Sequence, residues 1–477
     1  MTSRSMQRQM RVILIVLSTL VVVVVGALIA TGIPRNAAGM AAKSVCSAAF
    51  VAHRPAANLM AQDVLPASAV LRLVSISIDE PARRVSARYA GLFERHAQWL
   101  SQRGCVLDVA NGADVPTSVP DAAPADTGTP WPLGEAALPR AQWEQGVDGA
   151  ALALLVDNAF AGAGDPQAAN TRGIAVIYKG RALVLRTAPG FAIDTPLHGW
   201  SMAKTVLGML TYKLAHDTGM AFEQPVVDAI AGPRAPGWRV PWLADARRNI
   251  RVSDLLFMRD GLDSQEDYQP WGSIPRMLWG APDVAAFAAA VAPDAAPAKR
   301  WRYLSQSTNL LSGVDRARFA SDAEYWAYPS QELFGPIGAR TAVLETDTSG
   351  NWVGSAYLWA SIGDWARLGQ LMLQDGRWDG KAVLPPGWLA LAATPAMPSG
   401  EGQGYGAQTW RIGDPQQGRC RSSGLPPDTL AMDGHWGQVV AMVPSRDAVI
   451  VRLGWTFRGG QFDSCAFVAS VLKALPP

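Results

Sequence analysis

Cysteine, histidine and lysine are scarce in this chain of 477 residues, which contains four Cys, five His and seven Lys. No two cysteines are spaced as Cys-x-x-Cys, and the histidines are scattered, so neither residue type forms the clusters that bind zinc or other transition metals. Runs of Lys or Arg are also missing, and the formal net charge is only +2. We therefore expect neither a metal site nor a nucleic-acid partner.

Charge is missing altogether from residues 12–33, an apolar run near the N-terminus. A helix of this length, at about 1.5 Å per residue, reaches about 33 Å and could cross a bilayer. Arg4, Arg8 and Arg11 precede the run, so the N-terminus should stay in the cytoplasm and the rest be exported. We predict a transmembrane anchor in the inner membrane, with the remainder on the periplasmic, extracytoplasmic side. The alternative is a cleaved signal peptide and a secreted protein.

In an exported chain, an even number of cysteines favours disulfide bonds. The four cysteines allow three pairings. Sequence position favours Cys46–Cys105 and Cys420–Cys465, because each pair would then lie within one predicted domain. Buried free thiols are the alternative.

Composition divides the chain into four parts. Residues 1–40 hold the cytoplasmic stub and the predicted anchor or signal segment. Residues 41–108 contain two strand-like runs and are predicted to form a small N-terminal module. Residues 109–142 are rich in Pro, Ala, Asp and Gly, as expected of a linker, and residues 143–477 suffice for one large domain.

That large domain begins and ends with strand-like segments. A helical segment at 143–162 and a hairpin at 173–191 open it, and strands at 429–444 and 448–455 with a helix at 464–475 close it. Helical patterns fill the region between them. We therefore predict an α/β sheet in which the first and last strands are neighbours.

The stretch HGWSMAKT (198–205) places Ser201 three residues before Lys204, at the start of a helix predicted over 201–216 and ended by Gly219. Positions i and i+3 share one helix face. Because this helix is apolar on all sides, it should be buried, and desolvation would lower the pKa of Lys204 until it can accept the serine proton. Ser470 and Lys473 repeat the spacing close to the end of the sequence, and we interpret that copy as a helix surface.

Four further segments follow HGWSMAKT in a fixed order: RVSDLLFMRDGLD (251–263), YLSQSTNLL (303–311), AYLWASIGDWARLGQLML (356–373) and GHWGQVVAMVPSRDAVIVRLG (434–454). Over about residues 145–477, the set resembles the class C β-lactamase-like serine hydrolases. This superfamily includes penicillin-binding carboxypeptidases, esterases and the 6-aminohexanoate-dimer hydrolases, the branch that the chain resembles most. The resemblance implies a β-lactamase/transpeptidase-like α/β (α+β) fold, with a central antiparallel sheet flanked by helices and a helical subdomain.

The resemblance also implies roles for individual residues. Ser201 would be the acylated nucleophile and Lys204 its base. Tyr303 would pass a proton to or from the leaving group, and Ser305 would take the place of Asn in the family's Tyr-x-Asn motif. The backbone N–H groups of Ser201 and Gln438 would form the oxyanion hole.

The family's third motif, Lys-Thr-Gly, reads His435-Trp436-Gly437 in this chain. These residues would line the substrate site, with Trp436 as a wall and Gly437 allowing close approach of the substrate. Having His435 in place of Lys removes a fixed positive charge that would bind the carboxylate of a penicillin. Asp260 stands where the family usually has Ser, so the loop around it departs from the family pattern.

These features predict a serine hydrolase that cleaves a small-molecule ester or small amide through an acyl-enzyme on Ser201, without a metal or organic cofactor. One alternative is a penicillin-binding D-alanyl carboxypeptidase or weak β-lactamase. Another is a catalytically inactive binding protein of the cell envelope. An α/β-hydrolase is excluded, because no Gly-x-Ser-x-Gly sequence occurs.

Overall fold

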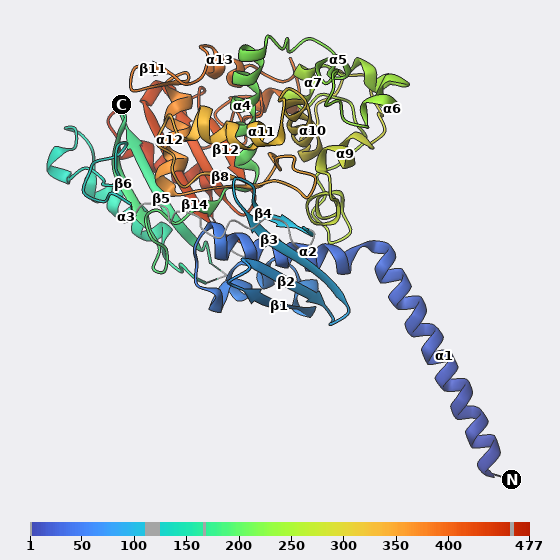
Figure 1. Cartoon of the computed structure of the whole chain (residues 1–477). Helices are drawn as coiled ribbons and strands as arrows, with labels where there is room; N and C mark the ends of the chain where they lie inside the picture. The colour runs from blue at the N-terminus through green and yellow to red at the C-terminus, as the bar shows by residue number, and fades with distance from the viewer. Residues whose placement is uncertain (1, 110–124, 166–167, 458–461) are drawn as a thin grey trace.

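The computed structural model describes residues 2–109, 125–165, 168–457 and 462–477 (Figure 1). The C-terminal domain is built on a five-stranded antiparallel sheet in the order β12-β13-β14-β5-β6. Its strands are β5 (Thr171–Tyr178), β6 (Arg181–Thr187), β12 (Leu430–Gly434), β13 (Gln438–Val443) and β14 (Ala448–Gly454). The last strand pairs with the first, with Ile450 opposite Val176, which confirms the predicted neighbours.

Helices cover both faces of this sheet, which explains why β5 and β14 are buried along their whole lengths. On one face, α12 (Ile362–Leu373) packs so closely that a Cβ on Gly369 would lie 2.6 Å from Val449. On the other face, α3 (Gly149–Ala159) and α14 (Ser464–Lys473) share a buried cluster with residues such as Ile450. Successive strand residues thus point into different layers.

The rest of the C-terminal domain is mostly helical. Its central helix, α4 (Ala203–Thr218), lies in the main hydrophobic cluster and ends at Gly219, whose φ of 68° confirms the predicted stop. The other helices are α5 (Val226–Ala229), α6 (Arg239–Leu243), α7 (Val252–Leu256), α8 (Ser273–Pro275), α9 (Val284–Ala289), α10 (Ser305–Arg316), α11 (Asp322–Pro329) and α13 (Trp388–Ala393). Short strands form two small sheets, β7 (Leu197–His198), β9 (Leu358–Ala360) and β8 (Val343–Leu344), and β10 (Arg377–Trp378) with β11 (Lys381–Ala382).

The N-terminal module is a four-stranded antiparallel sheet with a helix packed on it. The strands are β1 (Val74–Asp79), β2 (Arg84–Tyr89), β3 (Phe93–Leu100) and β4 (Gly104–Leu107), in that order, and α2 (Ile33–Cys46) lies against β2 and β3. A disulfide between Cys46 and Cys105 ties α2 to β4, and a second joins Cys420 to Cys465 in α14. Both predicted pairings are confirmed.

The predicted transmembrane helix is wrong. Helix α1 (Thr2–Thr31) ends before the apolar run does, because Gly32 adopts a left-handed φ of 73°. Ile33, the last residue of the run, instead begins α2 and is buried against the protein. Among the residues that the structure describes, no helix combines the length and apolarity that crossing a membrane requires. Figure 1 shows α1 extending away from the rest of the chain.

The middle of the predicted linker, residues 110–124, lies outside the described residues. Its later part packs on the C-terminal domain. Trp131 is buried and donates a hydrogen bond to the Gly363 carbonyl at 3.2 Å, and Glu135 pairs with the buried Arg367 at 2.7 Å. The predicted domain limits at residues 40, 108 and 142 stay predictions.

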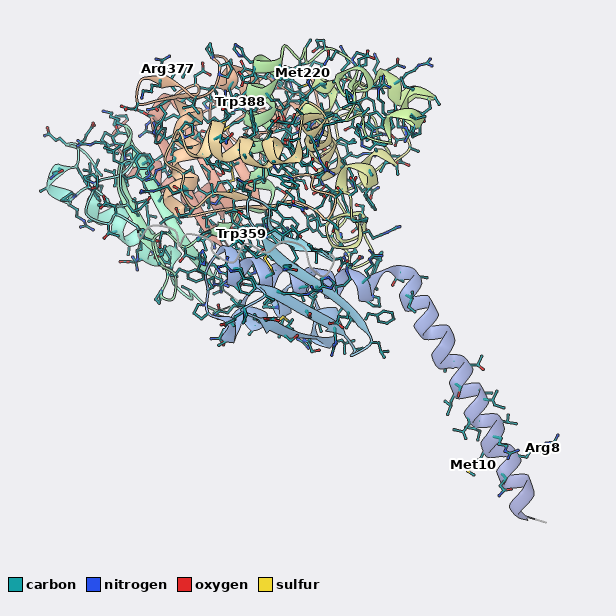
Figure 2. All side chains as sticks on the ribbon, in the orientation of Figure 1. Arg8, Met10, Met220, Trp359, Arg377 and Trp388 are labelled. Carbon is teal, nitrogen blue, oxygen red and sulfur yellow. A yellow bond between two sulfur atoms is a disulfide. The ribbon has the colours of Figure 1, made fainter. Side chains whose placement is uncertain are left out.

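A buried glutamate of the C-terminal domain joins the domain to the N-terminal module. Glu345 receives hydrogen bonds from Lys43 Nζ at 3.0 Å, Ser47 Oγ at 2.9 Å, the Cys105 backbone N–H at 2.7 Å and Trp359 Nε1 at 2.9 Å. Figure 2 shows Trp359 at this junction. Burial lowers the pKa of Lys43, and the Glu345 charge opposes that shift. The module is therefore fixed to the domain by a fully bonded buried carboxylate.

Candidate active site

Ser201 and Lys204 lie together at the start of α4. A short 3-10 turn over Trp200–Met202 leads into the helix, and Lys204 Nζ donates a hydrogen bond to Ser201 Oγ at 3.0 Å. Two further hydrogen bonds, to Ser305 Oγ at 2.9 Å and the Ser355 carbonyl at 2.8 Å, use the remaining N–H groups of the ammonium. Trp200 has a φ of 50°, a conformation that bulky residues rarely adopt, so the backbone is strained beside Ser201.

The environment of Lys204 favours its neutral form. Its side chain is only 1% exposed, and this burial lowers its pKa from 10.5 to about 8, while the Glu266 carboxylate opposes the change. At pH 7 about a tenth of the lysines would then be unprotonated, compared with fewer than about one in a thousand at the ordinary pKa. A neutral amine 3.0 Å from a serine hydroxyl can accept its proton.

A glutamate that sequence reasoning missed completes this network. Glu266 accepts the Ser305 backbone N–H at 2.8 Å and the Ser305 hydroxyl at 2.6 Å, and it accepts the Tyr268 hydroxyl at 3.3 Å. Lys204 is thus linked to a carboxylate through the hydroxyl of Ser305. Ser305, the first residue of α10, therefore holds the Lys204 side chain in place.

The ring of Tyr303 also lies close to Lys204. The lysine Nζ is 5.0 Å from the centre of its ring, which stacks on Trp410 with the ring centres 5.0 Å apart. Burial and then Glu266 raise the pKa of Tyr303 well above 10, and hydrogen bonding with Ser201 opposes this rise. Tyr268 shows the same pattern of causes, including a hydrogen bond with Ser201. Both phenols are therefore protonated at neutral pH and touch the serine.

The segment His435-Trp436-Gly437 forms a turn between β12 and β13, where the sequence predicted one continuous strand over 429–444. Trp436 and Gly437 have φ values of 63° and 84°, and a Cβ on Gly437 would lie 2.7 Å from an Arg452 nitrogen. Two left-handed residues in succession break the strand. The lack of space beside residue 437 also favours glycine, which has no Cβ.

This turn brings aromatic rings to the serine. The His435 ring stacks on Tyr268 with centres 4.6 Å apart, and Trp436 meets Trp200 edge-on at 5.0 Å. The side chain of Gln438 holds the turn, donating to the His435 carbonyl at 3.1 Å and accepting the Gly454 N–H at 2.8 Å. The oxyanion role predicted for the backbone N–H groups of Ser201 and Gln438 stays a prediction.

Two other sequence observations are explained by contacts. Asp260, which departs from the family pattern, is buried and accepts hydrogen bonds from the Ser307 hydroxyl and, at 2.9 Å, from the Leu262 N–H. It therefore fastens its loop to α10. The second Ser-x-x-Lys copy lies on α14 with Lys473 exposed, so the same spacing there creates no buried amine.

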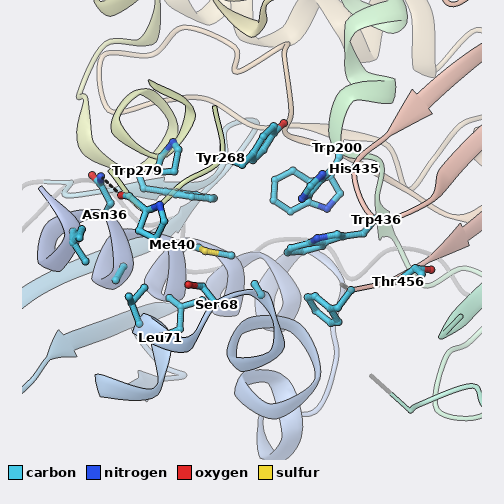
Figure 3. A pocket seen from close by; sticks show the side chains of 17 residues that line it. Asn36, Met40, Ser68, Leu71, Trp200, Tyr268, Trp279, His435, Trp436 and Thr456 are labelled. Carbon is cyan, nitrogen blue, oxygen red and sulfur yellow. Dashed lines mark hydrogen bonds between the residues drawn. The ribbon is translucent and has the colours of Figure 1, made fainter. Parts of the chain in front are cut away.

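A cavity of about 320 Å³ opens beside these aromatic rings, between the C-terminal domain and the N-terminal module (Figure 3). Trp200, Tyr268, His435 and Trp436 line it from the domain side. A volume of this size is at the lower end of the range for small-molecule sites. The predicted substrate-site residues His435 and Trp436 thus lie in its wall.

The fold and the buried serine–lysine pair define a β-lactamase-type hydrolase. The Beta-lactamase family matches residues 136–464, about two thirds of the sequence, and the chain belongs to this family. The predicted superfamily is confirmed. No curated protein sequence matches the chain.

Two solved structures share this fold at low identity, and a third is less similar. A family VIII carboxylesterase is 13% identical with a TM-score of 0.52, covering 69% of this chain and 97% of its own. EstCE1, described as a hydrolase with promiscuous acyltransferase activity, is 16% identical with a TM-score of 0.51, covering 68% and 98%. A Bacillus anthracis protein named "Putative 6-aminohexanoate-dimer hydrolase" is 19% identical with a TM-score of 0.49, covering 64% and 77%.

Proposed function

We propose that the chain is a serine hydrolase that cleaves a neutral ester or small amide through an acyl-enzyme on Ser201. The observation that carries the proposal is the buried Lys204 amine, 3.0 Å from Ser201 Oγ and with its pKa lowered to about 8. The second Ser-x-x-Lys copy, Ser470–Lys473, has an exposed lysine. Burial of the lysine, and not the spacing alone, therefore identifies Ser201 and Lys204 as a candidate active site.

In the proposed reaction, Ser201 Oγ attacks the carbonyl carbon and its proton passes to Lys204 Nζ. The tetrahedral intermediate collapses, the bond to the alkoxy or amino group breaks, and the leaving group takes a proton through the Tyr303 hydroxyl. Water then attacks the acyl-enzyme, and the same groups return the proton to Ser201. Backbone N–H groups of Ser201 and Gln438 would stabilise the oxyanion, each worth about 10²–10³ in rate.

The direct test follows hydrolysis of p-nitrophenyl acetate and butyrate by the native chain and by Ser201→Ala, Lys204→Ala and Ser470→Ala. We expect the first two substitutions to abolish turnover and the third, the matched control on α14, to leave it unchanged. Mass spectrometry should detect an acyl adduct on the native chain and none on Ser201→Ala. Absence of both turnover and adduct in the native chain would leave the inactive binding protein as the better hypothesis.

Incubation with penicillin separates the remaining alternative. His435 in place of a lysine, beside a cavity without fixed charge, gives a substrate carboxylate no ionic partner there. We therefore expect no covalent penicillin adduct. A stoichiometric adduct would instead favour the penicillin-binding carboxypeptidase.

We also propose that the protein is exported. Both cysteine pairs are disulfide-bonded, and disulfides persist mainly in oxidising compartments outside the cytoplasm. Alkylation of free thiols in intact cells tests this proposal. All four cysteines should resist alkylation until a reductant is added.

A further inference from the structure

The cavity lined by Trp200, the residue before Ser201, has two walls of different origin. The C-terminal domain supplies the rings of Trp200, Tyr268 and His435, and the N-terminal module supplies the opposite wall. The module's contribution comes from α2, with Met40 and Ala37 among its residues, and from the segment around Ala67–Leu71. Figure 3 shows the two sets of side chains facing each other across the space. The cavity therefore exists only when the module is in place.

The walls of the cavity are mostly apolar and carry no fixed charge. Among the described residues that line the cavity, none is Asp, Glu, Lys or Arg. The amide side chain that lines the cavity, Asn36, is already engaged, since its Nδ2 donates to the Pro270 carbonyl at 3.2 Å. A charged group placed here would lose its hydration without gaining an ionic partner. An uncharged apolar group would instead replace water against Met40, Leu71 and the aromatic rings.

The module wall is also held rigidly. Arg95 of β3 donates to the Trp279 carbonyl at 2.8 Å, and a Cβ on Gly39 of α2 would lie 2.7 Å from that same carbonyl. Lys43 of α2 is bonded to the buried Glu345. The cavity is therefore preformed, so apolar binding energy is not consumed in ordering a loop.

We propose that the N-terminal module is the specificity element of this hydrolase and that the cavity takes an uncharged apolar group of the substrate. That group is a medium-length alkyl chain or an aryl group, carried on either the acyl or the alcohol side of an ester or on an amide. This inference rests on the proposed function at Ser201. It makes the substrate class apolar esters or amides, recognised jointly by both parts of the chain.

The test compares two substitutions in one segment of the module. Ala67→Phe puts a ring into the cavity, while Ala69→Phe puts the same ring on an exposed residue that does not line it. Each is assayed with p-nitrophenyl esters from acetate to decanoate, and with acetates of alcohols of increasing length. In the native chain, kcat/KM should rise about fourfold per buried methylene in one of the two series, until the cavity is full.

With Ala67→Phe the rise should stop at least two methylenes earlier, a loss of about fifteenfold for the longest substrates relative to the native chain. Ala69→Phe should match the native chain. The series that shows the rise identifies whether the acyl or the alcohol group enters. A flat chain-length profile in both series, or an equal profile for the native chain and Ala67→Phe, overturns the proposal.

A binding measurement keeps this inference separate from the proposed function. N-phenyl-1-naphthylamine, an uncharged apolar fluorophore, should bind the native chain, Ala69→Phe and the inactive Ser201→Ala alike, and should bind Ala67→Phe at least tenfold more weakly. If Ser201→Ala keeps full esterase activity, the proposed function fails, yet this pattern would still support the cavity. If Ala67→Phe binds the probe as the native chain does, the cavity proposal fails even when Ser201 is the nucleophile.

Discussion

Replacing Glu266 by glutamine should move the pH dependence of hydrolysis to lower pH. The carboxylate is linked to Lys204 through Ser305, by hydrogen bonds of 2.9 and 2.6 Å that share the serine oxygen, so Nζ and Oε1 lie at most about 5.5 Å apart. A negative charge at this distance stabilises the ammonium and raises the pKa of Lys204. Glutamine removes that charge and keeps the shape.

The size of the effect follows from Coulomb's law. Two unit charges about 5.5 Å apart interact by about 3 kcal/mol at an effective dielectric constant of about 20, and partial exposure of Glu266 reduces this to about 1 kcal/mol. The pKa of Lys204 should then fall by about 0.7 unit. Because only neutral lysine can accept the proton, kcat/KM at pH 7 should rise about fourfold and the plateau above pH 9 should stay unchanged.

Hydrogen bonding permits this substitution. The glutamine carbonyl can accept the Ser305 N–H, and its amide can donate to Ser305 Oγ, whose own proton then points to the neutral lysine. The assay is the pH profile of p-nitrophenyl acetate hydrolysis between pH 5 and 10, with the exposed Glu80→Gln as control. An acid limb that stays in place, or moves to higher pH, would refute the electrostatic reasoning.

Two further predictions concern stability. Glu345→Gln should lower the free energy of unfolding at pH 7 by about 3 kcal/mol, because Lys43 loses its partner while buried, and Lys43→Met in addition should restore part of it. Equal stability of the single and double variants in urea would contradict this. His198, buried with its Nε2 donating to the Ala356 carbonyl at 2.8 Å, has its pKa lowered by burial to about 3. Unfolding frees it to bind a proton below about pH 6.5, so between pH 7 and pH 5 the native chain should lose about 2 kcal/mol more than His198→Phe.

The elements predicted correctly from the sequence are those fixed by local patterns. The strands β5 and β14 are covered on both faces, so they read as continuous apolar runs, and helices must lie between them in the chain. Ser201 and Lys204 are one helical turn apart, so their meeting needs no tertiary information. Gly219 ends α4 by its own backbone conformation.

Glu266 and Tyr268 could not be found in the same way. Glu266 contacts Ser305, 39 residues later in the chain, from a loop without periodic pattern, and the only signal was its position three residues after the RDGLD motif. The turn at His435–Gly437 was not predicted from the sequence, for a different reason. An apolar run predicts a strand whether or not two residues with positive φ interrupt it.

The error at the N-terminus has a physical cause that also bears on specificity. Hydropathy shows that Ile33 is apolar, but it does not show whether lipid or protein covers this residue. In the structure, protein covers Ile33, the last residue of the run, whereas Leu14 and Ile29 lie exposed on α1. Helix α2, which begins at Ile33, carries Met40 of the cavity wall, Lys43 bonded to Glu345 and Cys46 joined to Cys105, at intervals of three residues. Such spacing keeps the three side chains on neighbouring positions of α2. The contacts that hold the module in place therefore also set the position of the cavity wall, so stability of the module and selectivity of the site should change together.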